Sequence, residues 1–384
     1  MKETKFKNTE IREIPKDWEV IPIGKVCNVR RGVRVTKEQL TDEGRYPVYQ
    51  NTNYPMGYFD NYNVDANTPF VIVGGSAGQI GLSKERFWAA DDCAYFEKSN
   101  TLDKVFLYYE LTHRQFEIKK FVRTASVPRL DRKVVESFVL PLPSLHEQHR
   151  IASALTSIDN LISSLDKLIE KKKNIKQGAM QQLLTGKIRL KGFSEPWVEK
   201  KLGDIGSLAM CKRIFQEETS EKGDVPFYKI GTFGQQADAY ITKGKYEQFK
   251  QMYRFPQKGD VLISAAGTIG RTVIYNGEPA YFQDSNIVWL AHNGKYITNN
   301  FLFYIYQRTD WNTEDTTIAR LYNNNFNNTC IHFPSSITEQ QAIANILSKM
   351  DNEITALEAK KAKYEAIKQS MMQQLLTGKI RLIS

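Results

Sequence analysis

The stretch Met180-Gln-Gln-Leu-Leu-Thr-Gly-Lys-Ile-Arg-Leu190 recurs letter for letter as Met372 to Leu382. The second copy begins half a chain length after the first, in a chain of 384 residues. The same offset pairs Ser144 with Ser336, Glu147 with Glu339, Gln148 with Gln340, Ile151 with Ile343, Leu155 with Leu347 and Asp159 with Asp351. A repeat of such long period indicates duplicated domains and not a solenoid. Each half is a divergent globular segment followed by a nearly identical tail.

The tails divide the chain into four segments. We expect a globular domain over 1–143, a helical tail over 144–190, a second globular domain over 191–335 and a second tail over 336–384. Short β-type runs such as 71–73, 138–140, 261–264 and 287–290 alternate with helical patterns near 103–121 and 299–309. This alternation predicts two mixed α/β domains.

Each tail predicts one long helix. Ser144 with Glu147, and Ser336 with Glu339, have the spacing of a capping box, in which the Ser accepts from a free amide and the Glu reaches back. Gly186 and Gly378 lie where a left-handed C-terminal cap belongs. Between cap and glycine, apolar residues recur at intervals of three and four. They are Ile151, Leu155, Ile158, Ile162, Leu165 and Ile169 in the first tail, and Ile343, Leu347, Met350, Ile354, Leu357, Tyr364, Met371 and Leu375 in the second.

An amphipathic rod needs a partner to cover its apolar stripe. Because both rods carry the same stripe, the simplest solution packs one on the other as an antiparallel coiled coil with internal pseudo-twofold symmetry. The alternative is that each rod packs only on its own globular domain.

Composition limits the class of protein. The chain is 41% hydrophobic and 25% charged, which is too apolar for a disordered chain and too polar for a membrane protein. The first residues lack the apolar core of a secretion signal, so we expect a cytoplasmic protein without a membrane segment. Cys27, Cys93, Cys211 and Cys330 are isolated, which favours reduced, mostly buried thiols over disulfides or a zinc site. The formal charge of +10 favours a polyanionic partner.

The motifs of catalysis are missing from the sequence. Each of the Gly-Lys pairs lacks the following Ser or Thr of a phosphate-binding loop, so ATP use by this chain is not expected. His146 and His149 have no third ligand at metal-binding spacing, and Asp131-Arg-Lys133 resembles only half of a nuclease motif. We therefore expect a non-catalytic chain that binds no metal or cofactor of its own.

Basic and amide side chains of the two globular domains suit DNA instead. Arg pairs with guanine, and Asn or Gln with adenine, in the major groove, whereas phosphate contacts position the protein. In the first domain, Arg30, Arg31 and Arg34 flank Gly32, which would permit a turn that presents all three cations. The candidates are Arg30, Arg31, Arg34, Tyr49, Asn51, Asn53, Lys84, Arg86, Arg123 and Arg129, and in the second domain Lys212, Arg213, Lys229, Lys243, Lys245, Arg254, Arg271 and Arg320. Any one of them alone has the alternative of an ordinary solvated side chain.

These motifs together resemble the specificity subunit of type I restriction-modification systems. Pro141-Leu-Pro143 before Glu147-Gln148, Pro334 before Glu339-Gln340, and the repeated tail carry the resemblance. It also rests on Gly259-Asp-Val-Leu-Ile-Ser264 with Gly267-Thr-Ile-Gly-Arg271, which resemble motifs of target recognition domains in that family. In the first domain Thr68-Pro-Phe-Val-Ile-Val73 stands in place of that signature.

The resemblance implies a non-catalytic adaptor. Each target recognition domain would bind one half of a bipartite site in double-stranded DNA, and the helices would set the spacer between the halves. The helices would also dock two methyltransferase subunits, which use S-adenosylmethionine, and restriction subunits with ATP and Mg²⁺ would join that core. Two alternatives remain: a nuclease or methyltransferase with unrecognised motifs, or a scaffold that binds proteins and not DNA.

Overall fold

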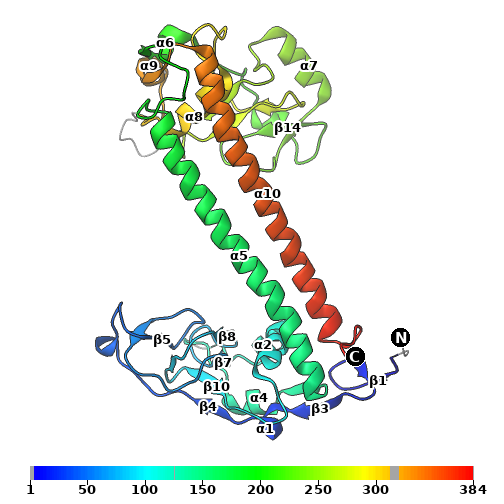
Figure 1. The fold of residues 1–384 in the computed structure, drawn as a ribbon. Coiled ribbons are helices and arrows are strands. Elements are labelled where there is room, and N and C mark those ends of the chain that lie inside the picture. The colour runs from blue at the N-terminus through cyan, green and yellow to red at the C-terminus, as the bar shows by residue number, and fades with distance from the viewer. Residues whose placement is uncertain (1–3, 125, 312–319, 384) are drawn as a thin grey trace. The chain divides into compact units, whose positions relative to one another are not determined.

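The computed structural model describes residues 4–124, 126–311 and 320–383. The chain forms two compact units, of which the first comprises Met1–Lys167 with Glu358–Ser384 and the second Leu168–Leu357. Each unit contains one mixed α/β domain and part of both long helices, α5 (Leu145–Leu183) and α10 (Ile337–Leu375) (Figure 1). The two predicted α/β domains and the two predicted long helices are therefore confirmed.

The domain of the first unit is built on a four-stranded antiparallel sheet of order β4-β10-β7-β8. Its strands are β4 (Val29–Arg31), β7 (Thr68–Ile72), β8 (Ile80–Ser83) and β10 (Cys93–Phe96). Every residue of β7 is buried, as expected of an apolar run covered on both faces. Smaller sheets join β5 (Tyr46–Tyr49) to β6 (Gly57–Phe59) and β9 (Trp88–Ala89), β1 (Phe6–Asn8) to β2 (Glu13–Pro15), and β3 (Glu19–Pro22) to β11 (Val139–Leu142). The helices are α1 (Ile23–Val26), α2 (Lys104–His113), α3 (Gln115–Lys119) and α4 (Arg132–Ser137), with a 3-10 turn at Lys37–Gln39.

The domain of the second unit repeats this topology. Its four-stranded sheet has the order β13-β19-β16-β17, formed by β13 (Ser207–Met210), β16 (Val261–Ser264), β17 (Thr272–Ile274) and β19 (Ile287–Ala291). Smaller sheets join β14 (Val225–Tyr228) to β15 (Tyr240–Ile241) and β18 (Tyr281–Phe282), and β12 (Trp197–Lys201) to β20 (Cys330–Pro334). The helices are α6 (Leu202–Ile205), α7 (Lys243–Met252), α8 (Asn299–Arg308) and α9 (Asn323–Asn328), with a 3-10 turn at Gln216–Glu218. Strand for strand the two main sheets correspond, while α7 has no counterpart among the described residues of the first unit.

Ion pairs show that α5 and α10 run antiparallel within each unit. In the first unit Asp159 pairs with Lys368 and Asp166 with Lys361, each at 2.6 Å. A later residue of α5 thus pairs with an earlier residue of α10. In the second unit Lys172 pairs with Glu353 at 2.6 Å and Lys176 with Asp351 at 2.5 Å, in the same sense. The predicted antiparallel pairing is confirmed.

All fourteen residues of the predicted apolar stripes are buried or half-buried. Ile151 and Leu155 join the core of the first α/β domain, and Ile343 and Leu347 join that of the second. Leu165 belongs to neither core, yet it is 5% exposed beside the Asp166–Lys361 ion pair, so α10 covers it. Each helix thus packs on a globular domain near its start and on the other helix further along, which combines the two arrangements that the sequence left open.

Each repeated stretch packs on the globular domain that it does not directly follow. Met372, Leu375 and Leu376 lie in the core of the first unit beside Trp18. Met180, Leu183 and Leu184 lie in the core of the second. The helices end at left-handed glycines, Gly186 (φ 69°) and Gly378 (φ 71°), as predicted. The same eleven residues are needed twice because each copy docks one helix end on one domain.

The capping-box prediction is only half right. The Ser144 hydroxyl accepts from the Glu147 amide at 3.3 Å, and Ser336 does the same for Glu339. The Glu side chains do not reach back to the caps, because each binds an arginine of the repeated stretch. Arg381 donates to the Glu147 carboxylate at 2.7 and 2.8 Å.

In the second unit, Arg189 donates to Glu339 through Nε and Nη2, both at 2.7 Å. The neighbouring glutamines complete the same motif. Gln148 Nε2 donates to the Pro143 carbonyl, and Gln340 Nε2 to that of Pro334, both at 2.9 Å. In each unit the Glu-Gln pair therefore links the start of one long helix to the strand before it and to the end of the other long helix.

Candidate DNA-recognition interface

A loop after β7 gathers several predicted DNA-binding residues of the first unit. The loop Gly74–Gln79 makes a backbone bridge to Arg129 through Gly74, and Arg129 bridges to Arg123 in turn. On its other side the Ser76 amide donates to the Asn51 carbonyl at 2.9 Å. Gly75 has φ 83°, and a Cβ there would lie 2.8 Å from that of Asn51, so the close approach requires glycine.

Asp92 orients the arginines of this loop. Its Oδ1 accepts from Arg129 Nη1 and lies 3.9 Å from Arg31 Nη2. Both arginine side chains stay more than half exposed, while the Asp92 side chain is 16% exposed. We call Arg31, Asn51, Asp92, Arg123 and Arg129 with the loop Gly74–Gln79 the first loop cluster. It offers fixed, exposed donors of the type that binds guanine edges or phosphates.

The second unit has an equivalent arrangement after β16. The loop Ala265–Gly270 bridges to Arg320 through Ala266, as Gly74 does to Arg129. Arg213 pairs with Asp284 at 2.9 Å, and Arg271 Nη1 donates to the Phe233 carbonyl at 3.0 Å. We call Arg213, Arg271, Asp284 and Arg320 with this loop the second loop cluster.

The clusters differ at one equivalent strand position. The Asp92 carbonyl accepts from Val73 and the Asn286 carbonyl from Ala265, each at 2.8 Å, so the two residues correspond. Asp92 holds two arginines, whereas Asn286 Oδ1 is buried without a hydrogen-bond partner among the described residues. The same scaffold thus presents different charges in the two units.

The predicted turn of three cations around Gly32 does not form. Arg30 and Arg31 are neighbours on β4, so their side chains point to opposite faces. Arg30 pairs with Glu97 at 3.0 Å, away from Asp92. Gly32 is needed for space and not for a turn, because a Cβ would lie 2.2 Å from the Ala89 carbonyl oxygen.

Other candidates of the first unit lie outside the loop cluster or at its margin. Tyr49 is a correction, because it is 9% exposed and packs between Phe70 and Phe87 in an aromatic core, where it cannot contact DNA. Lys84 donates to Asn160 of α5 at 3.1 Å. Of the remaining three, Arg34 is exposed, and Arg86 pairs with Asp65 at 3.7 Å. Asn53 is half-buried, and its backbone N–H donates to Gln79 Oε1 at 3.4 Å.

The remaining candidates of the second unit lie outside the second loop cluster or at its margin. Lys212 follows β13 next to Arg213, and Lys229 follows β14 and pairs with Asp238 at 2.9 Å. Lys243 and Lys245 lie on α7, and Arg254 follows it. Lys245 pairs with Glu218 there.

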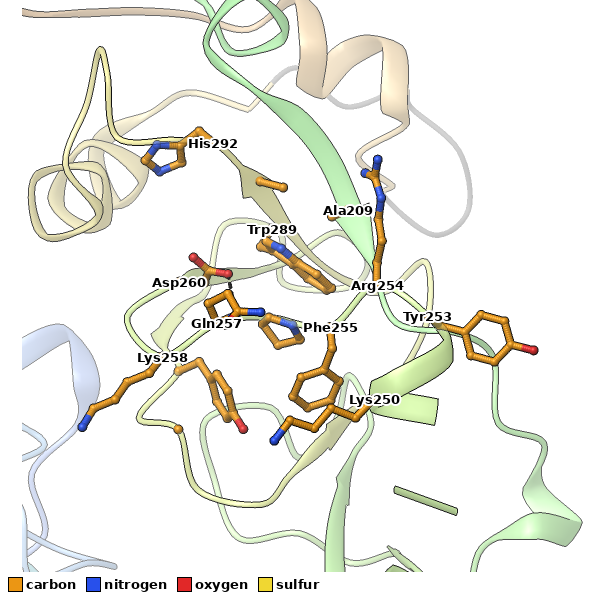
Figure 2. Close-up of a pocket in the computed structure, with 14 residues that line it drawn as sticks. Ala209, Lys250, Tyr253, Arg254, Phe255, Gln257, Lys258, Asp260, Trp289 and His292 are labelled. Carbon is orange, nitrogen blue, oxygen red and sulfur yellow. Dashed lines mark hydrogen bonds between the residues drawn. The ribbon is translucent and has the colours of Figure 1, made fainter. Parts of the chain in front are cut away.

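Arg254 lines a cavity of about 670 Å³ together with Lys250, Lys258 and Trp289 (Figure 2). Lys258 precedes β16, whereas the loop Ala265–Gly270 follows that strand, so the cavity lies at the far end of the sheet from the second loop cluster. The structure does not join Arg254 to that cluster.

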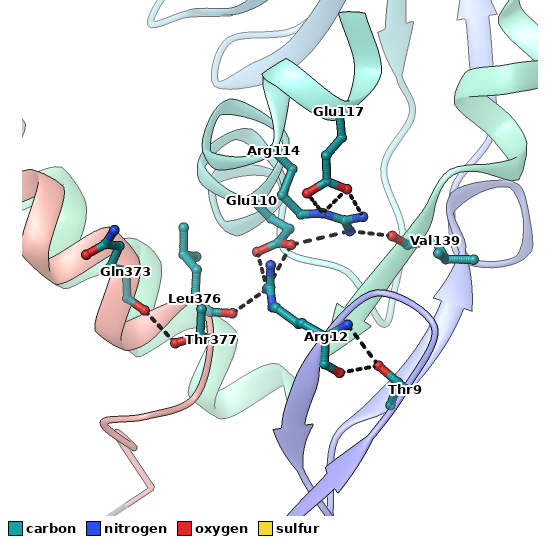
Figure 3. Close-up of polar contacts among 9 residues, drawn as sticks. All are labelled: Thr9, Arg12, Glu110, Arg114, Glu117, Val139, Gln373, Leu376 and Thr377. Atoms are coloured by element: carbon teal, nitrogen blue, oxygen red, sulfur yellow. Dashed lines mark hydrogen bonds and ion pairs between the residues drawn. The ribbon is translucent and has the colours of Figure 1, made fainter. Parts of the chain in front are cut away.

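The first unit contains a buried charge network that sequence reasoning missed (Figure 3). Glu110 of α2 is fully buried and accepts from Arg12 Nη2 at 3.1 and 3.2 Å, and Arg114 lies 3.7 Å away. Arg12 also donates to the Leu376 carbonyl at 2.7 Å, which ties the end of α10 to the domain. Burial raises the pKa of Glu110, and the two arginines oppose that rise.

Replacing Arg12 with leucine should destabilise the first unit by about 2–3 kcal/mol at pH 8, because Glu110 would keep only the more distant Arg114. The pKa of Glu110 would rise further. A carboxyl whose pKa is higher in the folded state binds more protons there, so stability is lost as pH rises from about 4.3 through the folded-state pKa. We therefore expect a smaller deficit at pH 5, measured by urea unfolding. Adding Glu110→Gln should abolish the pH dependence, and an equal deficit at both pH values would contradict the expectation.

Three of the four thiols are buried, as predicted, and all four are free. Burial raises the pKa of Cys27 to about 11 and that of Cys211 to about 12, so both thiols stay protonated at neutral pH. Over residues 4–124, 126–311 and 320–383, no group of three or more His, Cys, Asp or Glu side chains is placed to hold a metal ion. Among the same residues no helix is both long enough and apolar enough to cross a bilayer.

Two α/β domains of matching topology, each packed on an antiparallel pair of long helices, define a class of internally duplicated proteins. A family model described as the type I restriction modification DNA specificity domain matches residues 15–177 and again 194–369. The chain therefore belongs to the family of type I restriction-modification specificity subunits, and it carries two copies of their domain.

Individual relatives agree with this assignment. A Haemophilus influenzae protein named as a type I restriction enzyme specificity subunit is 33% identical over 371 residues, covering 93% of this chain and 95% of its own. The MjaVIII specificity subunit of Methanocaldococcus jannaschii is 27% identical, with coverage of 99% and 97%. The crystal structure of a type I S subunit from M. genitalium shares the fold, with a TM-score of 0.70 at 20% identity over 97% of this chain and 98% of that one.

Proposed function

We propose that each loop cluster recognises one half of a bipartite site in double-stranded DNA. The observation that carries this proposal is the repeated geometry: a glycine-containing loop bridged to an arginine, Arg129 in one unit and Arg320 in the other, beside a second arginine held by an aspartate. The chemistry around that geometry differs, with Asp92 in one unit and Asn286 in the other. A constant frame with different side chains suits two domains that bind different base sequences.

The helix pair would act as the fixed scaffold and as the docking surface for two methyltransferase subunits. Apart from the buried stripe, α5 exposes Leu161, Leu168 and Ile175, which are 37%, 39% and 48% exposed. Their spacing of seven residues places them on one face, as in the contact seam of a coiled coil. Exposed apolar residues in such a row favour a helical partner.

The chain itself would be non-catalytic and would act in the cytoplasm. S-adenosylmethionine would belong to the methyltransferase subunits, and ATP and Mg²⁺ to restriction subunits that join the complex. Methylome sequencing of a host that carries this chain with its methyltransferase tests the proposal. We expect one methylated motif of two defined halves separated by a fixed gap; a motif without a gap, or no new methylation, would contradict it.

Removing the cations of the first loop cluster should weaken DNA binding and its dependence on salt. For the variant Arg31→Ala, Arg123→Ala, Arg129→Ala, the slope of log affinity against log salt should decrease by about 2–3, since each phosphate contact contributes about 0.9. The matched control replaces three exposed lysines elsewhere in the unit, Lys16, Lys25 and Lys98. Fluorescence anisotropy across a salt series measures both. Equal slopes for the two variants would remove the cluster from the interface.

A further inference from the structure

The short helix α3 presents an exposed aromatic and basic face. Phe116 is 74% exposed and Phe121 is 53% exposed. Lys119, Lys120 and Arg123 are also exposed. Positions 116, 119 and 120 have the three- and four-residue spacing of one helical face, and Phe121 and Arg123 follow the end of the helix. We call these five residues the α3 face.

The inner side of this segment is hydrogen-bonded to the domain and partly buried in it, which fixes the position of the exposed rings. Arg114 is 4% exposed, donates to Glu117 at 2.6 and 3.1 Å, and donates to the Val139 carbonyl at 2.6 Å (Figure 3). Gln115 accepts from the Ile80 amide at 2.9 Å, and Ile118 is buried. The inner side of α3 therefore joins the domain core, while Phe116 stays in solvent. An exposed apolar surface on a fixed element indicates a binding partner.

The charge on this face points to a polyanion. The nearest acid, Glu117, is occupied by Arg114. Among the described residues, Lys119, Lys120 and Arg123 make no ion pair at contact distance, although the charge of Lys120 helps to lower the pKa of Glu117. Lys120 lies 5.0 Å from the centre of the Phe116 ring. Three exposed cations around two exposed rings match DNA, which offers phosphates beside apolar base edges.

The α3 face is continuous with the first loop cluster. Gly75, Ser76, Ala77 and Gln79 of the loop share a cavity of about 370 Å³ with Lys119 and Val122. Loop and helix also approach closely at Gly78, where a Cβ would lie 3.0 Å from Lys119 Cγ. Arg123 belongs to both surfaces, since its backbone bridges to Arg129.

We propose that the α3 face is a second DNA contact of the first unit. Lys119, Lys120 and Arg123 bind phosphates, and Phe116 and Phe121 make apolar contacts to base edges next to those bound by the loop cluster. The proposal rests on the proposed function and adds a specificity-determining surface to it.

The test measures binding of the full chain, assembled with its methyltransferase, to a duplex carrying the methylome-defined site and to one lacking it. Phe116→Ser with Phe121→Ser should weaken binding to the site about 10- to 100-fold and binding to the other duplex much less. Lys119→Gln with Lys120→Gln should weaken both and lower the salt slope by about 2. The control is Met252→Ser at the end of α7, an apolar residue whose exposed fraction (61%) lies between those of Phe116 and Phe121, and it should change neither affinity.

Unchanged binding of the Phe116, Phe121 variant to the site would overturn the proposal. The proposal would also be overturned if this variant bound DNA normally but no longer bound the methyltransferase, because the α3 face would then contact protein. Failure of the proposed function would give a different result: the complex with the wild-type chain would bind the two duplexes equally well.

Discussion

Replacing Arg381 with alanine is expected to lower the free energy of unfolding of the first unit by about 3–5 kcal/mol, because it leaves a buried carboxylate without its cation. Glu147 is 1% exposed and Arg381 is 9% exposed. Arg381 also pairs with Asp17 at 2.6 Å and lies 5.6 Å from the centre of the Trp18 ring. The substitution therefore removes the main polar attachment of the C-terminal stretch to the first domain.

Hydrogen exchange of the peptide 372–382, combined with urea unfolding, measures this effect. Lys379→Ala is the matched control, since Lys379 is exposed and only two residues away. Glu147→Gln in the Arg381→Ala background should restore part of the loss, because the buried charge is then absent. Arg189→Ala should cost less, since Arg189 is 30% exposed. If Arg381→Ala and Lys379→Ala gave equal exchange rates, the ion pair would not hold the stretch.

Exchanging the first domain for that of another family member should change one half of the methylated site and leave the other half unchanged. Each loop cluster is built from residues of a single unit, so its base contacts move with its domain. A site changed at three base pairs should bind on the order of 10³-fold or more weakly, because each mismatch costs about 1–3 kcal/mol.

The exchange of residues 1–143 must keep the contacts to the end of α10. Arg12, Trp18 and Glu110 should therefore be retained in the donor sequence, because Arg12 binds the Leu376 carbonyl and Trp18 donates to Glu147 at 3.1 Å. Methylome sequencing gives the result, and an unaltered gap between the halves is the internal control for an intact helix pair. A change in both halves would rule out independent recognition domains.

The helical part of the fold could be predicted because its determinants are local. The intervals of three and four residues from Ile151 to Ile169 are sufficient to define a buried stripe, and Gly186 and Gly378 mark the ends. The helices run over Leu145–Leu183 and Ile337–Leu375, close to the expected segments.

The candidate site was harder to predict because its residues come from distant parts of the chain. Arg31, Asp92 and Arg129 meet only through the pairing of β4, β10 and β7. Strand alternation then sends Arg30 to the opposite face, although it is the next residue. The residues around Tyr49 have the composition of a DNA-binding loop. Its position at the end of β5 nevertheless places its ring in an aromatic core.

The sequence by itself determined the duplication, the two long helices and the basic, motif-poor character that suits a DNA-binding adaptor. These follow from periodicity, repetition and composition, which need no knowledge of distant contacts. Only the tertiary structure decided that each repeated stretch docks on the domain it does not follow, and that Glu147 and Glu339 hold its arginine. Their partners lie 234 and 150 residues away along the chain, and such pairs are fixed by packing and by the cost of burying an unpaired charge, not by local sequence.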